Sequence, residues 1–344
     1  MKKITLLISL LILNFSCTPE KAIATEEPKT EITSTETPTT ENQSNDILVS
    51  YYTVSDGNRL YEHFFEDNGN RYQKIVSPDG QIYVDFKYDS ANKMTSISYT
   101  NGAKRDYYFY YNTKGQIEKI KQEGETNTFT NGVYSTTITT QEWDITYDGN
   151  TILKTLKNDL YPFSKTITKY TLNDKGLITI IHNYVENTRT PAYSRTVSYL
   201  TLKYDTNKNL ITFKATDKAT HDLPDSPDPN YTNTGIVYFE YDTNPNPIYP
   251  IYMNHYLNYS LIDVYPFSYS IKSDQDRMLW TGYNNLKKTI YDFELTTTPV
   301  GNPIIKYTNI YEYDPTNNKP TRMSTRSTTD NKEYSFIKYN YRAK

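Results

Sequence analysis

Much of the chain alternates apolar and polar residues with a period of two, which is typical of β-strands that bury one face. Counting back by two from a recurring Tyr gives apolar or aromatic positions, while most residues between them are polar. These sets are Val84, Phe86, Tyr88; Tyr107, Phe109, Tyr111; Trp143, Ile145, Tyr147; Leu200, Leu202, Tyr204; and Val237, Phe239, Tyr241. We therefore expect antiparallel strands with one buried and one solvent-exposed face.

A turn signal follows these strands. Asp or Asn comes directly after the last Tyr or its equivalent, and a second strand then begins at an aliphatic residue, as at Tyr88-Asp89, Tyr111-Asn112, Tyr147-Asp148, Leu172-Asn173 and Tyr204-Asp205. The Asp or Asn side chain can bond nearby backbone N–H groups, and Gly115 and Gly176 allow a positive φ. Tyr241-Asp242 and Tyr313-Asp314 begin in the same way, but Pro247 and Pro320 then replace the aliphatic residue.

Six further dipeptides predict hairpins between alternating segments. They are Asp56-Gly57, Asn68-Gly69, Asp79-Gly80, Asn101-Gly102, Asn131-Gly132 and Asp148-Gly149. The spacing between copies of the Tyr-Asp phrase is irregular, which disfavours a solenoid of fixed pitch. We predict an all-β fold over residues 47–344, an antiparallel meander of successive hairpins that is curled toward a partly open barrel or forms a layered sheet.

Two alternatives to this fold are less consistent with the sequence. No stretch sustains a helical period over three turns, and the best helix candidate lies between Ser273 and Tyr291. A porin-like membrane barrel fits poorly, since outward positions such as Asp85, Lys87 and Lys203 are charged where a lipid-facing band is apolar.

The first seventeen residues predict a lipoprotein signal peptide. Met1-Lys2-Lys3 precedes an apolar run from Ile4 to Leu13, which is too short to span a membrane. Cys17 is the single cysteine of the chain, and Leu13 and Ser16 place it in a sequence that resembles a lipobox. An ordinary cleaved signal peptide is the alternative. A single cysteine also excludes a disulfide within the chain.

Residues 18–46 predict a disordered tether, because Thr, Glu, Pro, Ser, Lys and Asn dominate and almost nothing apolar is available for burial. A secreted chain with an acyl group on Cys17 would be held in the cell envelope. We expect it in the outer membrane, with the membrane as a partner through this anchor alone.

The Tyr-Asp phrase resembles the YD (RHS-like) repeat. The whole chain resembles Bacteroidetes-type envelope lipoproteins with degenerate copies of this repeat, over about Tyr51 to Tyr341. The most specific parts are Tyr241-Asp242 before Asn246-Pro247 and Tyr311-Glu312-Tyr313-Asp314 before Lys319-Pro320. The resemblance implies an envelope lipoprotein with an antiparallel β domain and no established activity. Few copies keep the glycine, so a role as a delivery shell is not implied.

Catalytic and metal-binding patterns are weak. His63, His182, His221 and His255 lack metal-ligand spacing, and no motif for a nucleophile or a phosphate is present. In the loop 221–230, Asp222, Asp225 and Asp228 offer oxygen ligands for calcium, but the prolines favour a stiff exposed loop. We predict no metal and no cofactor. A net charge of -3 without a basic stripe disfavours nucleic acid.

Aromatic residues give the strongest functional hint, with 36 tyrosines in 344 residues. In the run 106–111, Tyr108 and Tyr110 alternate with the core face and should be exposed, while Trp280 lies outside the repeats. These three are the candidate binding residues, because exposed rings stack on sugars or on partner surfaces. The alternative is that Tyr simply covers a large sheet.

Three functions remain open on this basis. The first is a non-enzymatic module that binds a glycan, a peptide or a partner protein. The second is a structural or assembly accessory of an outer-membrane complex, and the third is a secreted hydrolase.

Overall fold

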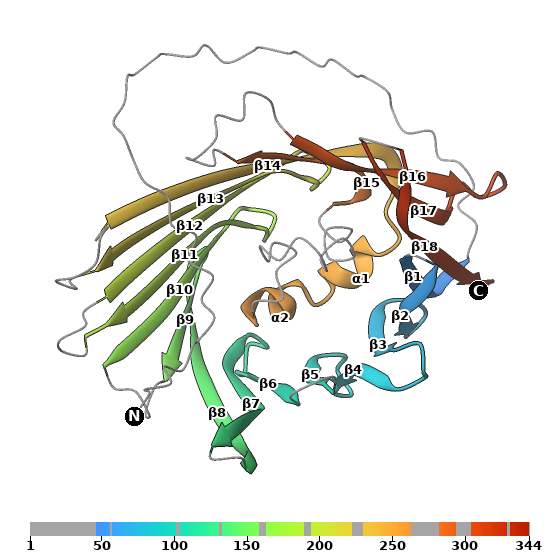
Figure 1. Ribbon diagram of the computed structural model, residues 1–344. Coiled ribbons are helices and arrows are strands. Elements are labelled where there is room, and N and C mark those ends of the chain that lie inside the picture. The colour runs from blue at the N-terminus through green and yellow to red at the C-terminus, as the bar shows by residue number, and fades with distance from the viewer. Residues whose placement is uncertain are drawn as a thin grey trace, which may run out of the picture.

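A computed structural model describes residues 46–343, except 56, 101–103, 131–132, 158–162, 189–193, 222–229, 263–281, 294–303 and 329–330. In these residues, eighteen antiparallel strands form one sheet that closes into a barrel (Figure 1). The first nine strands are β1 (Ile47–Ser55), β2 (Asn58–Glu66), β3 (Arg71–Val76), β4 (Ile82–Tyr88), β5 (Met94–Tyr99), β6 (Arg105–Tyr111), β7 (Ile117–Thr130), β8 (Val133–Asp148) and β9 (Thr151–Lys157). The others are β10 (Ser164–Leu172), β11 (Ile178–Asn187), β12 (Ser194–Tyr204), β13 (Leu210–His221), β14 (Asn230–Pro245), β15 (Asn284–Phe293), β16 (Ile304–Tyr313), β17 (Pro320–Ser327) and β18 (Glu333–Arg342).

The antiparallel meander is confirmed, but the expected opening of the sheet is wrong. β1 pairs with β18 as well as with β2, and Tyr51 lies opposite Tyr339 across this seam. A period of two defines which residues of a strand are buried, but it does not say whether the first and last strands meet. Closure pairs both edges that an open sheet would leave exposed.

The predicted core face is also confirmed. Five residues of this face lie in strands and are buried, namely Val84, Phe86, Phe109, Leu202 and Phe239. The charged positions between them point outward, and Lys87, Lys203 and Glu240 are exposed.

The Tyr-Asp phrases and their variants lie at one end of the barrel, because each is at or near the end of an even-numbered strand. Their geometry agrees with the prediction from sequence. The Asp89 Oδ1 atom accepts hydrogen bonds from the N–H groups of Ala91 and Lys93, both at 2.9 Å. Gly115 and Gly176 have φ values of 77° and 75°. We call this end of the barrel the turn end.

A tyrosine hydroxyl links neighbouring hairpins at the turn end. The tyrosine at the end of an even-numbered strand donates to the backbone carbonyl at the start of the strand before it. These bonds are Tyr88 to Tyr72 (2.8 Å), Tyr111 to Met94 (2.7 Å), Tyr204 to Ile178 (3.0 Å), Tyr241 to Leu210 (2.8 Å) and Tyr341 to Pro320 (3.1 Å). We call these bonds tyrosine staples.

Each staple lies just beyond the last backbone pair of its two strands. The pairing of β3 with β4 ends at Lys74 and Asp85, so the Tyr88 hydroxyl reaches a carbonyl that the ladder does not use there. β10 ends in Leu172 in place of Tyr, and there the Asn150 side-chain amide donates to the Leu172 carbonyl at 3.0 Å. The staples therefore extend the sheet by side chains where the backbones separate.

Two short helices, α1 (Tyr249–Met253) and α2 (Tyr256–Leu261), lie inside the ring of strands (Figure 1). They belong to the segment between β14 and β15, and we call them the plug. The Tyr259 ring packs against Tyr72 and Phe86, with centroid distances of 6.2 and 6.4 Å. In the described part of the chain, no helix combines the length and the apolarity needed to cross a membrane.

Polar contacts orient the plug. The Asn258 amide donates to the hydroxyl of the staple tyrosine Tyr111 at 2.9 Å, and the Asn254 amide donates to the Asn70 carbonyl at 2.8 Å. The Tyr256 hydroxyl accepts a hydrogen bond from the Ile178 N–H at 3.1 Å.

The sequence analysis missed the plug and placed a candidate helix elsewhere. Of that candidate, residues 273–281 lie outside the described residues, and residues 284–291 belong to β15. The departure at Pro247 was the available signal, because it falls one residue before the N-cap of α1. The helices are too short for a clear helical period.

The inner face of the barrel changes character along its axis. Near the turn end it is apolar and packs on the plug, whereas towards the other end of β10–β12 it carries Thr166, Asn183, Thr196 and Ser198. Val185 lies on this inner face and is 41% exposed. The buried face predicted from the period of two is therefore fully buried only where the plug covers it.

A single hydroxyl should have a measurable effect on stability. Tyr88→Phe removes the donor to the Tyr72 carbonyl while keeping the ring, so we expect the free energy of unfolding to fall by about 1–2 kcal/mol. Thermal unfolding followed by circular dichroism would measure this. The control is Tyr238→Phe on the outer face of β14, and a loss of equal size there would contradict the role of the staple.

Gly282 marks a close approach at the end of the plug segment. A Cβ atom at this position would lie 2.3 Å from Cε1 of the staple tyrosine Tyr241 and 2.7 Å from Oδ1 of Asn209. We expect Gly282→Ala to destabilise the barrel by about 1–3 kcal/mol through this overlap. In the control Gly124→Ala, the nearest atom would be 3.6 Å away, and its melting temperature should stay much closer to that of the wild type.

Candidate functional site

Aromatic and aliphatic side chains gather on the outer face of three consecutive strands. The register places Ile167 of β10, Tyr184 of β11 and Val197 of β12 in one row. His182 of β11 and Tyr199 of β12 form the next row, and Ile180 lies in the row after it. We call these six side chains the platform.

The centre of the platform is a stacked ring pair. The rings of His182 and Tyr199 have centroids 4.3 Å apart and planes inclined by 15°. Tyr199 is 45% exposed and Ile180 is 40% exposed, while Val197 in the neighbouring row is buried. The two stacked rings cover each other's faces, and the pair forms a partly exposed aromatic surface on the outside of the sheet.

Cationic side chains border the platform. Lys169 lies directly opposite His182 in the register, and the Arg195 guanidinium lies over the Tyr184 ring, 5.0 Å from its centroid. The pKa of His182 is lowered, first by partial burial and then by the positive charges of Lys169 and Arg195. At neutral pH the imidazole is therefore uncharged, and it stacks as a neutral ring.

Such a surface can bind without reacting. Flat aromatic rings stack on sugar rings or on apolar groups of a partner, and nearby Lys and Arg side chains add hydrogen-bond donors. Within the described ranges, no group of three His, Cys, Asp or Glu side chains could hold a metal ion. Of the loop 221–230, residues 222–229 lie outside these ranges, so its calcium hypothesis stays untested.

Tyr108 and Tyr110 lie on the outer face of β6, as predicted. Tyr110 is 40% exposed, and the Lys119 ammonium lies 4.4 Å from its ring centroid, whereas Tyr108 is half-buried beside Asp106. Three strands separate β6 from β10, so these tyrosines do not join the platform. Trp280 and Cys17 lie outside the described residues.

The platform residues were missed from sequence, although a signal was present. Ile180, His182 and Tyr184 alternate with the core residue Ile181 and with Asn183, so both faces of β11 carry large side chains. The same double-sided pattern in β6 predicts the exposure of Tyr108 and Tyr110. For His182, the sequence suggests only the question of a metal ligand.

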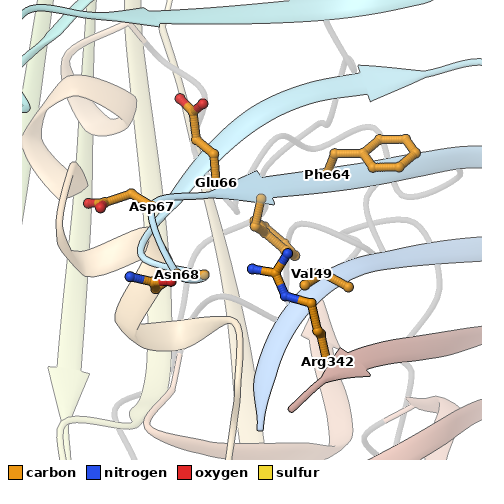
Figure 2. Close-up of a pocket in the computed structure, with 8 residues that line it drawn as sticks. Val49, Phe64, Glu66, Asp67, Asn68 and Arg342 are labelled. Carbon is orange, nitrogen blue, oxygen red and sulfur yellow. The ribbon is translucent and has the colours of Figure 1, made fainter. Parts of the chain in front are cut away.

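A second feature is a hollow of about 490 Å³ at the turn end (Figure 2). Figure 2 shows Glu66, Asp67 and Asn68 of the β2–β3 turn on one side and Val49 and Arg342 on the other. The Glu66 carboxylate accepts a hydrogen bond from the Arg71 Nε atom at 3.0 Å.

The hollow lies at the barrel seam, where the first described residues meet the last strand. A Cβ atom on Gly69 would lie 2.8 Å from the Leu48 carbonyl oxygen, so the turn folds closely against β1. The location of the hollow at the seam and the hydrogen bond between Arg71 and the Glu66 carboxylate favour a structural role for its residues. A cavity of about 30 Å³ between Trp143, Lys154 and Ile262 has room for a single water molecule.

No protein-family model matches the chain, and no curated protein matches it. Among solved structures, it is similar to a porin-like protein from Bacteroides vulgatus, with 10% identity and a TM-score of 0.36, covering 86% of this chain and 98% of the other. A porin-like protein from Bacteroides uniformis has 11% identity and a TM-score of 0.23, with 87% and 98% covered. Because both TM-scores are below 0.5, the function must be argued from the residues of this chain.

The electrostatics of the platform can be measured directly. We expect the His182 imidazole to titrate below the ordinary histidine pKa of about 6.5, and Lys169→Gln to raise its pKa by removing a neighbouring positive charge. A pH titration of the histidine ring signals by NMR would show both effects. Lys165→Gln is the control and should leave the pKa of His182 unchanged. An unchanged His182 pKa in Lys169→Gln would contradict this explanation of the lowered pKa.

Proposed function

We propose that this chain is a lipid-anchored protein of the cell envelope whose barrel binds a partner molecule on its outer face and catalyses no reaction. The ligand classes that suit an aromatic surface are a glycan, a peptide or a partner protein. The observation that carries the proposal is the exposed His182–Tyr199 stack with its cationic border.

The sequence supports a lipid anchor. The signal pattern and Cys17 support acylation, and residues 18–46 support a flexible tether. The end of this segment lies at the turn end, because the Asn317 amide donates to Asp46 Oδ2 at 3.0 Å, and Lys319 contacts the Asp46 carbonyl. A barrel hung from this point would hold its turn end towards the membrane.

Charge on the outer face supports a barrel displayed outside the lipid. Lys87, Lys203 and Glu240 are exposed at outward positions, where a lipid-facing band would be apolar. We propose the outer membrane as the location, and the YD-like resemblance is consistent with an envelope lipoprotein.

Binding should depend on the platform. We expect Tyr199→Ala to weaken binding roughly tenfold, because a central exposed ring contributes about 1.5 kcal/mol or more. Glycan arrays and pull-downs from envelope extracts, each followed by titration of the ligand found, would measure it. The control is Tyr334→Ala, a similarly exposed tyrosine on β18.

The same assays decide between surfaces. A ligand lost in Tyr108→Ala and Tyr110→Ala but kept in Tyr199→Ala would move the site to β6. A membrane complex that co-purifies with all these variants would contradict binding through the aromatic faces and would favour an assembly accessory.

A further inference from the structure

Exposed cations surround the platform on the outer face of the barrel. One lies on β10 beside His182, one lies on β13 a single row from Tyr199, and two lie on β12, each two rows from Tyr199 in opposite directions. A row spans about 7 Å along a strand and neighbouring strands lie about 4.8 Å apart, so all four backbones lie within roughly 14 Å of that of Tyr199. In this order the cations are Lys169, Lys214, Lys203 and Arg195, and all four are exposed.

These cations have no carboxylate to neutralise them. Among the residues that the structure describes, no ion pair involves any of the four, whereas Lys157 pairs with Asp144 at 2.9 Å elsewhere on the outer face. The outward strand positions that are described on β10–β13 hold a single acidic residue, Glu186. The whole chain has 37 basic and 40 acidic residues. The positive charge of this face therefore results from placement and not from composition.

A second exposed ring lies next to these cations, outside the platform. Tyr238 on the outer face of β14 is 38% exposed, and it lies opposite Thr212, which in turn lies opposite Lys203. Two strands and two rows separate Tyr238 from Tyr199, which is about 17 Å between backbones. The register places Lys214 midway between the two tyrosines. We call Tyr199, Lys214, Lys203 and Tyr238 the track.

The surroundings of the track suit a polar, anionic ligand. Thr201 and Thr212 lie on either side of Lys214 along the line between the rings, and their hydroxyls can donate and accept hydrogen bonds. The nearest outward carboxylate on β14, that of Glu240, pairs with Lys288 at 3.1 Å. The track therefore offers two partly exposed rings, two ammonium groups and two hydroxyls on one continuous sheet face.

We propose that the track binds an anionic glycan, whose sugar rings stack on Tyr199 and Tyr238 and whose carboxylate or sulfate groups pair with Lys214 and Lys203. Aromatic rings suit the apolar faces of sugars, and the threonines suit their hydroxyls. An acidic peptide would use the lysines without needing two rings at this spacing. This inference rests on the proposed function, because Tyr199 belongs to both sites, and it adds three residues outside the platform.

Paired polysaccharides test the class of ligand. The probes are polygalacturonate and dextran sulfate, with methyl-esterified polygalacturonate and dextran as neutral counterparts and polyglutamate as a polyanion without sugar rings. Calorimetric titration of the full chain should show at least roughly tenfold tighter binding of an anionic polysaccharide than of its neutral counterpart, and high salt should weaken it because exposed charges are screened. Equal binding of polyglutamate, or no binding of either anionic polysaccharide, would overturn the proposal.

Variants separate the track from the platform. The double variant Lys203→Gln with Lys214→Gln, and separately Tyr238→Ala, should each weaken binding of the anionic polysaccharide roughly fivefold or more. The control Lys87→Gln removes an exposed outward lysine of β4 and should have no effect. All these side chains are exposed, so the melting temperatures should stay close to that of the wild type.

The failure of this inference differs from the failure of the proposed function. Binding that is lost in Tyr199→Ala but unchanged in the lysine double variant and in Tyr238→Ala would overturn the track and leave the platform in place. Binding that is unchanged in all three would overturn both.

Discussion

The architecture depends on one hydrogen bond that recurs around the barrel, from a tyrosine hydroxyl to a backbone carbonyl beyond the end of the strand ladder. Beyond the last pair of two strands, a carbonyl no longer faces a backbone donor of the partner strand, and the tyrosine hydroxyl supplies a donor there. Burial raises the pKa of Tyr111 and Tyr204, so both hydroxyls keep the proton that they donate. The same tyrosine also contributes its ring to the core, which explains why this residue type ends so many strands.

The staples link the closure of the sheet to the filling of its interior. They hold neighbouring turns together at one end, and the plug packs on the inner side of the same end. Asn258 donates directly to the staple tyrosine Tyr111, and Gly282 lies against the ring of Tyr241. The plug therefore stabilises the end where the backbones separate. At the other end, the inner face carries small polar residues and Val185 is partly exposed.

The staples and the plug occupy the turn end, so the outer face of the barrel remains available for interactions. Asp46, directly before β1, is held at the turn end by Asn317 and Lys319. The platform lies on the side of the barrel, on β10–β12. The proposed binding surface on the side of the barrel therefore shares no residues with the turn end.

The sequence by itself determined the strands, their buried face and the chemistry of the turns, because a period of two and the side chains of Asp and Asn act locally. The exposure of Tyr110 could be predicted on the same grounds. Closure through β1 and β18, the plug after Pro247 and the stack of His182 on Tyr199 were decided only by the tertiary structure. Each of these joins residues whose proximity depends on the curvature and pairing of whole strands, and no local pattern encodes that distance.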